Sequence, residues 1–166
     1  MPQGPAARVT DPVAHPLPPI LTPGPGSPNV LIGFLPAWRG IPLAAVAALQ
    51  SAKATADTAV KAAEAASTAA AGTPAGPAAK AAEEAAKAAA LAAMSSAISS
   101  AAAGADIHLC TTPLPIPPHG PGVDITGSAT VMINNLPAGR MGDTILEALG
   151  PQNTITKGEP TVIIGG

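Results

Sequence analysis

A short segment of this chain occurs more than once, and the repetition restricts what the chain can fold into. Residues Gly26 to Arg39 have a near copy at Gly127 to Arg140, and Gly158 to Gly166 copy the first half of the same segment. The N-terminus supplies the other half, because Pro5 to Asp11 match Pro137 to Asp143. Such self-similarity indicates one supersecondary unit used several times. We therefore expect a domain with pseudo-threefold repetition.

The spacing of the copies indicates an insertion. Arg8 and Arg39 are 31 residues apart, and Gly127 and Gly158 are also 31 apart, but Gly26 and Gly127 are 101 apart. The surplus corresponds to an alanine-rich block between the first two complete copies. Removing that block restores an Arg-x-x-Asp spacing at the junction, as expected for an insertion at a turn.

We therefore divide the chain into a discontinuous domain, 1–40 and 105–166, and an inserted segment, 41–104. The insertion predicts two helices, at about 43–71 and 78–103, because alanine is the best helix former and a Gly- and Pro-containing break separates them. We expect the two helices to form an antiparallel hairpin. Because alanine buries little surface, this hairpin should be only marginally stable alone. Its carboxylates are expected on a solvated face: Asp57, Glu64, Glu83 and Glu84.

Each repeat predicts a pair of short strands. Runs rich in β-branched and aliphatic residues occur at 29–32, 130–133 and 161–164, bounded by Gly, Pro, Ser and Asn. The dipeptide Asn-Asn at 134–135 suits a two-residue hairpin turn because Asn tolerates positive φ, and Gly-Phe occupies the same place at 33–34. We expect a mainly β fold interrupted by the helical hairpin.

Composition excludes several classes. The net charge is −2 with eight basic residues, which argues against a nucleic-acid binder. The single cysteine cannot form an internal disulfide, and the N-terminus lacks the basic and apolar regions of a classical signal peptide. A long uncharged stretch of the insertion, Ala88 to Ala105, is mostly Ala and Ser and is a weak candidate for a membrane span. Aromatic residues are only 1%, so the core is thin, and a metal, a partner or oligomerisation is expected to complete it.

The histidines and the cysteine form one candidate metal site. His15 lies four residues after Asp11, as Cys110 lies four after Asp106, so the two occupy equivalent repeat positions. His108 and Cys110 are two apart and would share a strand face. With His119 they make a set of the number and type that tetrahedral zinc requires, His15, His108, Cys110 and His119. The alternative is three loop histidines and a buried thiol without metal; the repeat equivalence favours zinc.

Other chemistry is weakly supported. The sequence has no phosphate-binding Gly-Lys-Ser/Thr and no Gly-x-Ser-x-Gly nucleophile turn. Zinc held by four side chains would have no open position for water, which argues against an enzyme. The arginines and aspartates that recur in each repeat are interpreted as structural turn pairs: Arg8, Arg39 and Arg140 with Asp11, Asp106 and Asp143.

The repeats resemble the PAAR family. The resemblance is carried by Pro5-Ala-Ala-Arg-Val-Thr-Asp11 and Leu136-Pro-Ala-Gly-Arg-Met-Gly-Asp143, together with the Gly-Ser-x-x-Val-x-Ile segments, and covers 1–40 and 105–166. It implies a small conical domain that caps the blunt end of a trimeric VgrG-type spike in type VI secretion and related contractile injection machines. It also implies one structural zinc per chain on three His and one Cys, which match His15, His108, Cys110 and His119.

The chain also departs from the family pattern. Trp38 and Gly139 replace the second Ala of the motif, the third copy stops at Gly166, and nothing in the motif explains the insertion. We expect a non-enzymatic tip that sharpens the spike and helps to pierce a target membrane. Its hairpin would dock an effector, a chaperone or the spike flank, or would meet the bilayer. It would be cytoplasmic until it is loaded and carried out. The alternative is a small secreted effector or toxin, in which the repeats are the delivery module and the alanine-rich hairpin acts on the target membrane.

Overall fold

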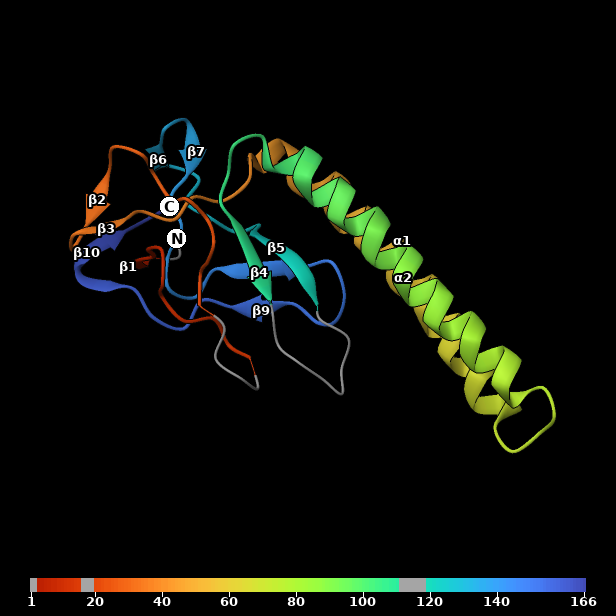
Figure 1. The fold of residues 1–166 in the computed structure, drawn as a ribbon. Coiled ribbons are helices and arrows are strands. Elements are labelled where there is room, and N and C mark those ends of the chain that lie inside the picture. Colours follow the sequence, from red (N-terminus) through yellow and green to blue (C-terminus); the bar gives the residue numbers. More distant parts are fainter. Residues whose placement is uncertain (1–2, 16–19, 111–118) are drawn as a thin grey trace.

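The computed structural model describes residues 3–15, 20–110 and 119–166. It combines two long helices with several small antiparallel sheets, so the fold is mixed α/β rather than mainly β (Figure 1). The helices have 28 and 27 residues, whereas the longest described strand, β10, has six. The strands are β1 (Gly4–Ala6), β2 (Leu31–Ile32), β3 (Leu35–Pro36), β4 (Ile107–Cys110), β5 (Gly120–Asp124), β6 (Met132–Ile133), β7 (Leu136–Pro137), β8 (Thr144–Glu147), β9 (Asn153–Thr154) and β10 (Glu159–Ile164).

The strands form one four-stranded sheet, ordered β4-β5-β8-β9, and three strand pairs, β1-β10, β2-β3 and β6-β7. Two of these pairs are the hairpins predicted from the repeats. Their turn residues have φ of 53° and 67° at Gly33 and Phe34 and of 53° and 64° at Asn134 and Asn135. Positive φ at both central positions defines the two-residue turn whose twist matches that of the strands. The sequence-based interpretation of these turns is confirmed.

Helices α1 (Leu43–Ala70) and α2 (Gly76–Ala102) form an antiparallel hairpin that projects from the β part, away from β2, β3 and β10 (Figure 1). Their bounds agree with the predicted helices to within two residues. Among the described residues, neither helix combines the length and the apolar character needed to cross a membrane. At its root the hairpin shares a core with the sheet, in which Leu49, Met94 and Ile98 pack with Val123 and Leu146.

One carboxylate of the hairpin is not on the predicted solvated face. Glu83 is only 6% exposed, and it accepts hydrogen bonds from Lys80 at 2.8 Å and Lys87 at 2.6 Å. Lys87 also bridges to Glu64 of the other helix at 2.9 Å. Hydrogen bonds from Lys80, Lys87 and Ser67 lower the pKa of Glu83 to about 2. Alanine allows the helices to approach so closely that this carboxylate is enclosed between them.

A ring of backbone hydrogen bonds joins the three repeats. Ala7 donates its N–H to the carbonyl of Gly139, Gly139 donates to Trp38, and Trp38 donates back to Ala7, each at 2.9 Å. One buried cluster contains an alanine and an isoleucine from equivalent positions of each repeat: Ala6, Ala37, Ala138, Ile32, Ile133 and Ile164. Three segments that are far apart in the sequence therefore meet around one approximate threefold axis.

Trp38, which stands where the repeat motif has alanine, is completely buried. Glycines provide the space for its indole. A Cβ atom on Gly24 would lie 2.6 Å from indole Cζ3, and one on Gly139 would lie 3.1 Å from Cδ1. The tryptophan and the glycine therefore form a matched pair of departures, since the large ring in one copy packs directly against the residue without a side chain in the next.

Arginine–aspartate pairs brace the ring in all three copies, as predicted. In each, the aspartate accepts the backbone N–H of its arginine, at 2.8, 2.8 and 2.7 Å, and also the guanidinium, at 3.0, 2.9 and 3.0 Å: Arg8–Asp11, Arg39–Asp106 and Arg140–Asp143. Charge-assisted hydrogen bonds of this kind are strong and directional. The second pair is made across the insertion, so the chain leaves the ring and returns to it within one such contact.

Replacing Arg140 with Met should lower the free energy of unfolding by about 3–5 kcal/mol, because it leaves the carboxylate of Asp143 buried and unpaired. The two side chains are 3% and 6% exposed. Arg8→Met is the matched control and should cost less, since the Arg8 side chain is 16% exposed and water can replace it. Urea unfolding of both variants measures the difference; equal small losses would contradict the structural role of the pair.

Candidate metal centre

Strand β4 brings His108 and Cys110 to one buried face, as the spacing of two residues predicted. His108 is fully buried and Cys110 is 1% exposed, whereas Leu109 between them is 43% exposed. Strand β5 pairs with β4 in a register that puts Gly120 opposite Cys110. This register places His119, the residue just before β5, close to the cysteine.

Four side chains converge beside this strand pair. The candidate ligand atoms of His15, Cys110, His119 and Glu147 all lie within 4.8 Å of one another. His15 Nε2 lies 2.8 Å from His119 Nδ1 and 3.4 Å from Cys110 Sγ. Oε2 of Glu147 lies 2.7 Å from His119 Nδ1 and 3.7 Å from His15 Nε2. The sequence thus predicted three of the four residues that the structure brings together.

These distances fit a bound cation. Ligands about 2.0–2.3 Å from a tetrahedral ion lie roughly 3.3–3.7 Å from one another, so small side-chain shifts suffice to surround an ion. The site is also well enclosed, since the side chains of His15, Glu147 and His119 are 3%, 0% and 12% exposed. Two imidazoles, a thiol and a carboxylate are the donor types of transition-metal sites. The group can therefore hold a metal ion.

His108 lies next to this group but not in it. Its Nδ1 is 2.9 Å from the carbonyl oxygen of Ile20 and must carry the proton, because a carbonyl only accepts. Its Nε2 lies 3.5 Å from Oε1 of Glu147, and neither of these two atoms has a closer hydrogen-bond partner among the described residues. A buried carboxylate next to an imidazole requires a positive charge nearby, which a proton on Nε2 or a bound cation can supply.

Glu147 is not among the ligands predicted from the sequence. It ends strand β8 in the run Ile145-Leu-Glu-Ala-Leu149, and it is completely buried. One signal was available in the sequence, because Glu147 is the single carboxylate in the otherwise apolar run 145–149. A charge buried in such a run requires a partner. Burial acts to raise the pKa of Glu147, but hydrogen bonds and positive charge from His108 and His119 outweigh it and lower the pKa. The group is therefore an ionised carboxylate, the form that binds metals.

A tetrahedral ion held by all four residues would have no position for water, which is the arrangement of a structural site rather than a catalytic one.

The sequence predicts that His119 lies in a Pro/Gly loop. Residues 117–118 of that loop lie outside the described part of the chain, and its later residues begin strand β5 instead.

The chain was compared with protein-family models, with curated proteins and with solved structures, and none matches it. The interpretation of the site therefore depends on the geometry of this chain.

Titration with Co²⁺, a coloured probe of tetrahedral sites, should saturate at one equivalent. We expect intense visible bands and a thiolate-to-cobalt charge-transfer band, because the four donors include one sulfur. Cys110→Ser should lose the charge-transfer band. The weak spectrum of an octahedral ion, or binding that is unchanged in Cys110→Ser, would contradict a site built from these residues.

Proposed function

We propose that this protein is the non-enzymatic, zinc-stabilised tip of a contractile injection spike of the type VI secretion kind. It caps a trimeric VgrG-type spike protein, sharpens its end and helps it to pierce a target membrane. It stays in the cytoplasm until it is loaded on the spike. In this proposal the PAAR-like repeats form the tip, and the helical hairpin extends sideways from it to couple an effector or a chaperone.

One observation carries this proposal: equivalent apolar side chains are exposed in all three repeats. Leu31 of β2, Met132 of β6 and Ile163 of β10 are 62%, 51% and 57% exposed. The next residue of each strand points inward, and these three isoleucines are at most 7% exposed. Large apolar side chains exposed in a regular arrangement are typical of a binding surface.

The number of these positions matches the proposed partner. A trimeric spike ends in three identical chains, and a single-chain cap can meet each of them in the same way only if it repeats its own surface three times. The backbone ring through Ala7, Trp38 and Gly139 supplies that repetition. The side chains exposed around it supply the apolar contact.

Zinc is the metal that best suits the candidate site in this proposal. Thiolate, imidazole and carboxylate ligands in a closed tetrahedron are typical of structural zinc. Such an ion can contribute on the order of 10 kcal/mol to folding, which benefits a chain with only one buried aromatic residue, Trp38, among those described. We assign His15, Cys110, His119 and Glu147 as ligands, with His108 orienting the free oxygen of Glu147 in place of its predicted role as a ligand.

Purified protein should contain one zinc per chain, and chelation should lower the melting temperature. X-ray absorption should show one sulfur, two imidazole nitrogens and one oxygen around the ion. Glu147→Gln should then weaken zinc binding by 10-fold or more, whereas His108→Gln should weaken it less. If X-ray absorption instead shows three imidazoles, and His108→Gln weakens zinc binding more than Glu147→Gln does, the ligand set predicted from the sequence is correct. A folded protein without metal would refute the zinc site.

Met132→Asp should weaken binding to the spike trimer of the same cell about 10-fold or more, because it places a charge at an apolar contact. The melting temperature should change little, since this side chain is exposed. Leu43→Asp is the control, because Leu43 is 42% exposed but lies on the helical hairpin. Light scattering and a pull-down should show one chain per trimer. Equal binding by Met132→Asp and the unaltered protein would refute this contact surface.

A further inference from the structure

The helical hairpin reaches the candidate metal centre through a buried lysine. Lys53 of α1 is 6% exposed and donates a hydrogen bond from Nζ to the carbonyl oxygen of Gly150 at 2.9 Å. The same Nζ pairs with Asp57, one turn further along the helix. An ammonium is rarely buried unless its hydrogen bonds are satisfied. This contact therefore fixes the position of Gly150 relative to α1.

Gly150 in turn packs on a ligand of the candidate site. A Cβ atom built on Gly150 would lie 2.9 Å from Nε2 of His119, 3.1 Å from Cδ2 and 3.2 Å from Cε1. The backbone of residue 150 therefore lies against the side of the ring that carries Nε2, while Nδ1 faces the other donors. The neighbouring Leu149 donates its N–H to the carbonyl of His119 at 2.9 Å. The turn holds both the main chain and the ring of His119.

The second helix supports the other neighbour of the same histidine. Leu91 of α2 packs on Gly120, where a Cβ atom would lie only 2.6 Å from Leu91 Cδ1. Gly120 has φ of +77° and pairs with Cys110 across β4 and β5. Both helices of the hairpin thus contact residues that position His119.

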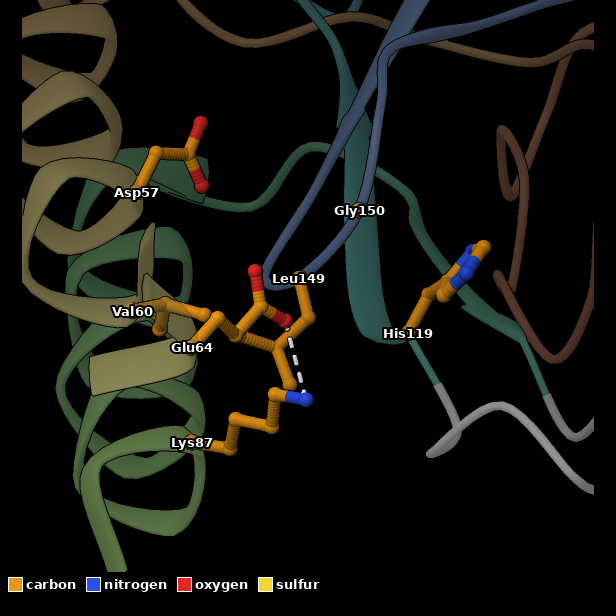
Figure 2. A pocket seen from close by; sticks show the side chains of 7 residues that line it. All are labelled: Asp57, Val60, Glu64, Lys87, His119, Leu149 and Gly150. Atoms are coloured by element: carbon orange, nitrogen blue, oxygen red, sulfur yellow. Dashed lines mark ion pairs between the residues drawn. The ribbon is translucent and has the colours of Figure 1, made fainter. Parts of the chain in front are cut away.

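A pocket of about 160 Å³ separates the hairpin from this ligand. It is lined by Asp57, Val60, Glu64 and Lys87 of the helices and by His119, Leu149 and Gly150 of the β part (Figure 2). With its side chain 12% exposed, His119 is more accessible than His15 at 3% or Glu147 at 0%. Water and small chelators in the pocket would meet His119 before these more deeply buried donors.

We propose that the hairpin is a clamp that retains the metal, with Lys53 as the positioning residue. This inference rests on the proposed metal site. Release of an ion from a closed site begins when one ligand turns away and a water or a chelator replaces it. His119 can turn only if the turn at Gly150 moves, and the hydrogen bond from Lys53 opposes that movement. Residues that hydrogen-bond directly to a ligand typically change metal affinity by 10–100-fold when they are replaced, and we expect the lower end of this range from Lys53, which acts through Gly150.

The test uses the full-length chain loaded with zinc and an excess of a chromogenic chelator. Lys53→Met keeps the apolar stem but removes the donor, and it should release zinc about tenfold faster than the unaltered protein while still binding one equivalent. Leu91→Ala, which acts from the other helix, should also speed release. It keeps the proposal testable if Lys53→Met fails to fold.

Two controls separate positioning from a general loss of stability. Lys80→Met removes a hairpin ion pair with Glu83 and Glu84, and it should leave the release rate unchanged. Ile98→Ala weakens the buried core at the root of the hairpin without altering Lys53 or Gly150. The two variants are compared at denaturant concentrations equally far below their unfolding midpoints. Under these conditions Ile98→Ala should release zinc more slowly than Lys53→Met.

The outcomes distinguish this proposal from the proposed function. Unchanged release in Lys53→Met and Leu91→Ala, with zinc bound at one equivalent, would overturn the clamp and leave the metal site standing. Equal release by Lys53→Met and Ile98→Ala would also overturn it, because stability alone would then set the rate. An unaltered protein that binds no zinc would refute both proposals.

Discussion

The ring of backbone hydrogen bonds through Ala7, Trp38 and Gly139 is the constraint on which the β part depends. It joins three segments that are distant in the sequence. Ala7 and Gly139 are small, and the bulky Trp38 packs against Gly24 and Gly139. Two of the three arginines beside the ring are buried and Arg8 is partly buried. An aspartate pairs with each guanidinium and satisfies its charge. The strand pairs then radiate from the ring, and their outward residues are placed in equivalent positions.

The ring also explains how the chain accommodates a helical hairpin. The insertion begins and ends at one arginine–aspartate pair, Arg39 and Asp106, so the two ends of the hairpin lie close together in the fold. A long insertion at such a point is tolerated, because the entropic cost of closing a loop grows only slowly with its length. The hairpin is nevertheless joined to the rest of the molecule, because its root shares a core with β5 and β8 and Lys53 is bonded to Gly150. The alanine-rich helices therefore obtain from the sheet the burial that they lack between themselves.

The candidate metal centre lies where these two parts meet. Its donors come from β4, from the residues next to β5, from the end of β8 and from His15 near the N-terminus, so one ion would tie together segments that the ring does not connect. Two glycines, at 120 and 150, allow the helices and the turn to contact the surroundings of His119. Stability, metal retention and the position of the hairpin would accordingly be coupled.

Local pattern was enough to predict the helix bounds, the positive-φ turns at 33–34 and 134–135, and the repeated arginine–aspartate pairs, because each depends on residues close together in the sequence or on the repeat itself. Three of the four clustered donors were also predicted, since histidine and cysteine are rare here and conspicuous. Glu147 and Glu83 were not, because a carboxylate is identified as buried only by what surrounds it. Those surroundings come from distant segments, and only tertiary structure brings Glu147 to the histidines and encloses Glu83 between two helices.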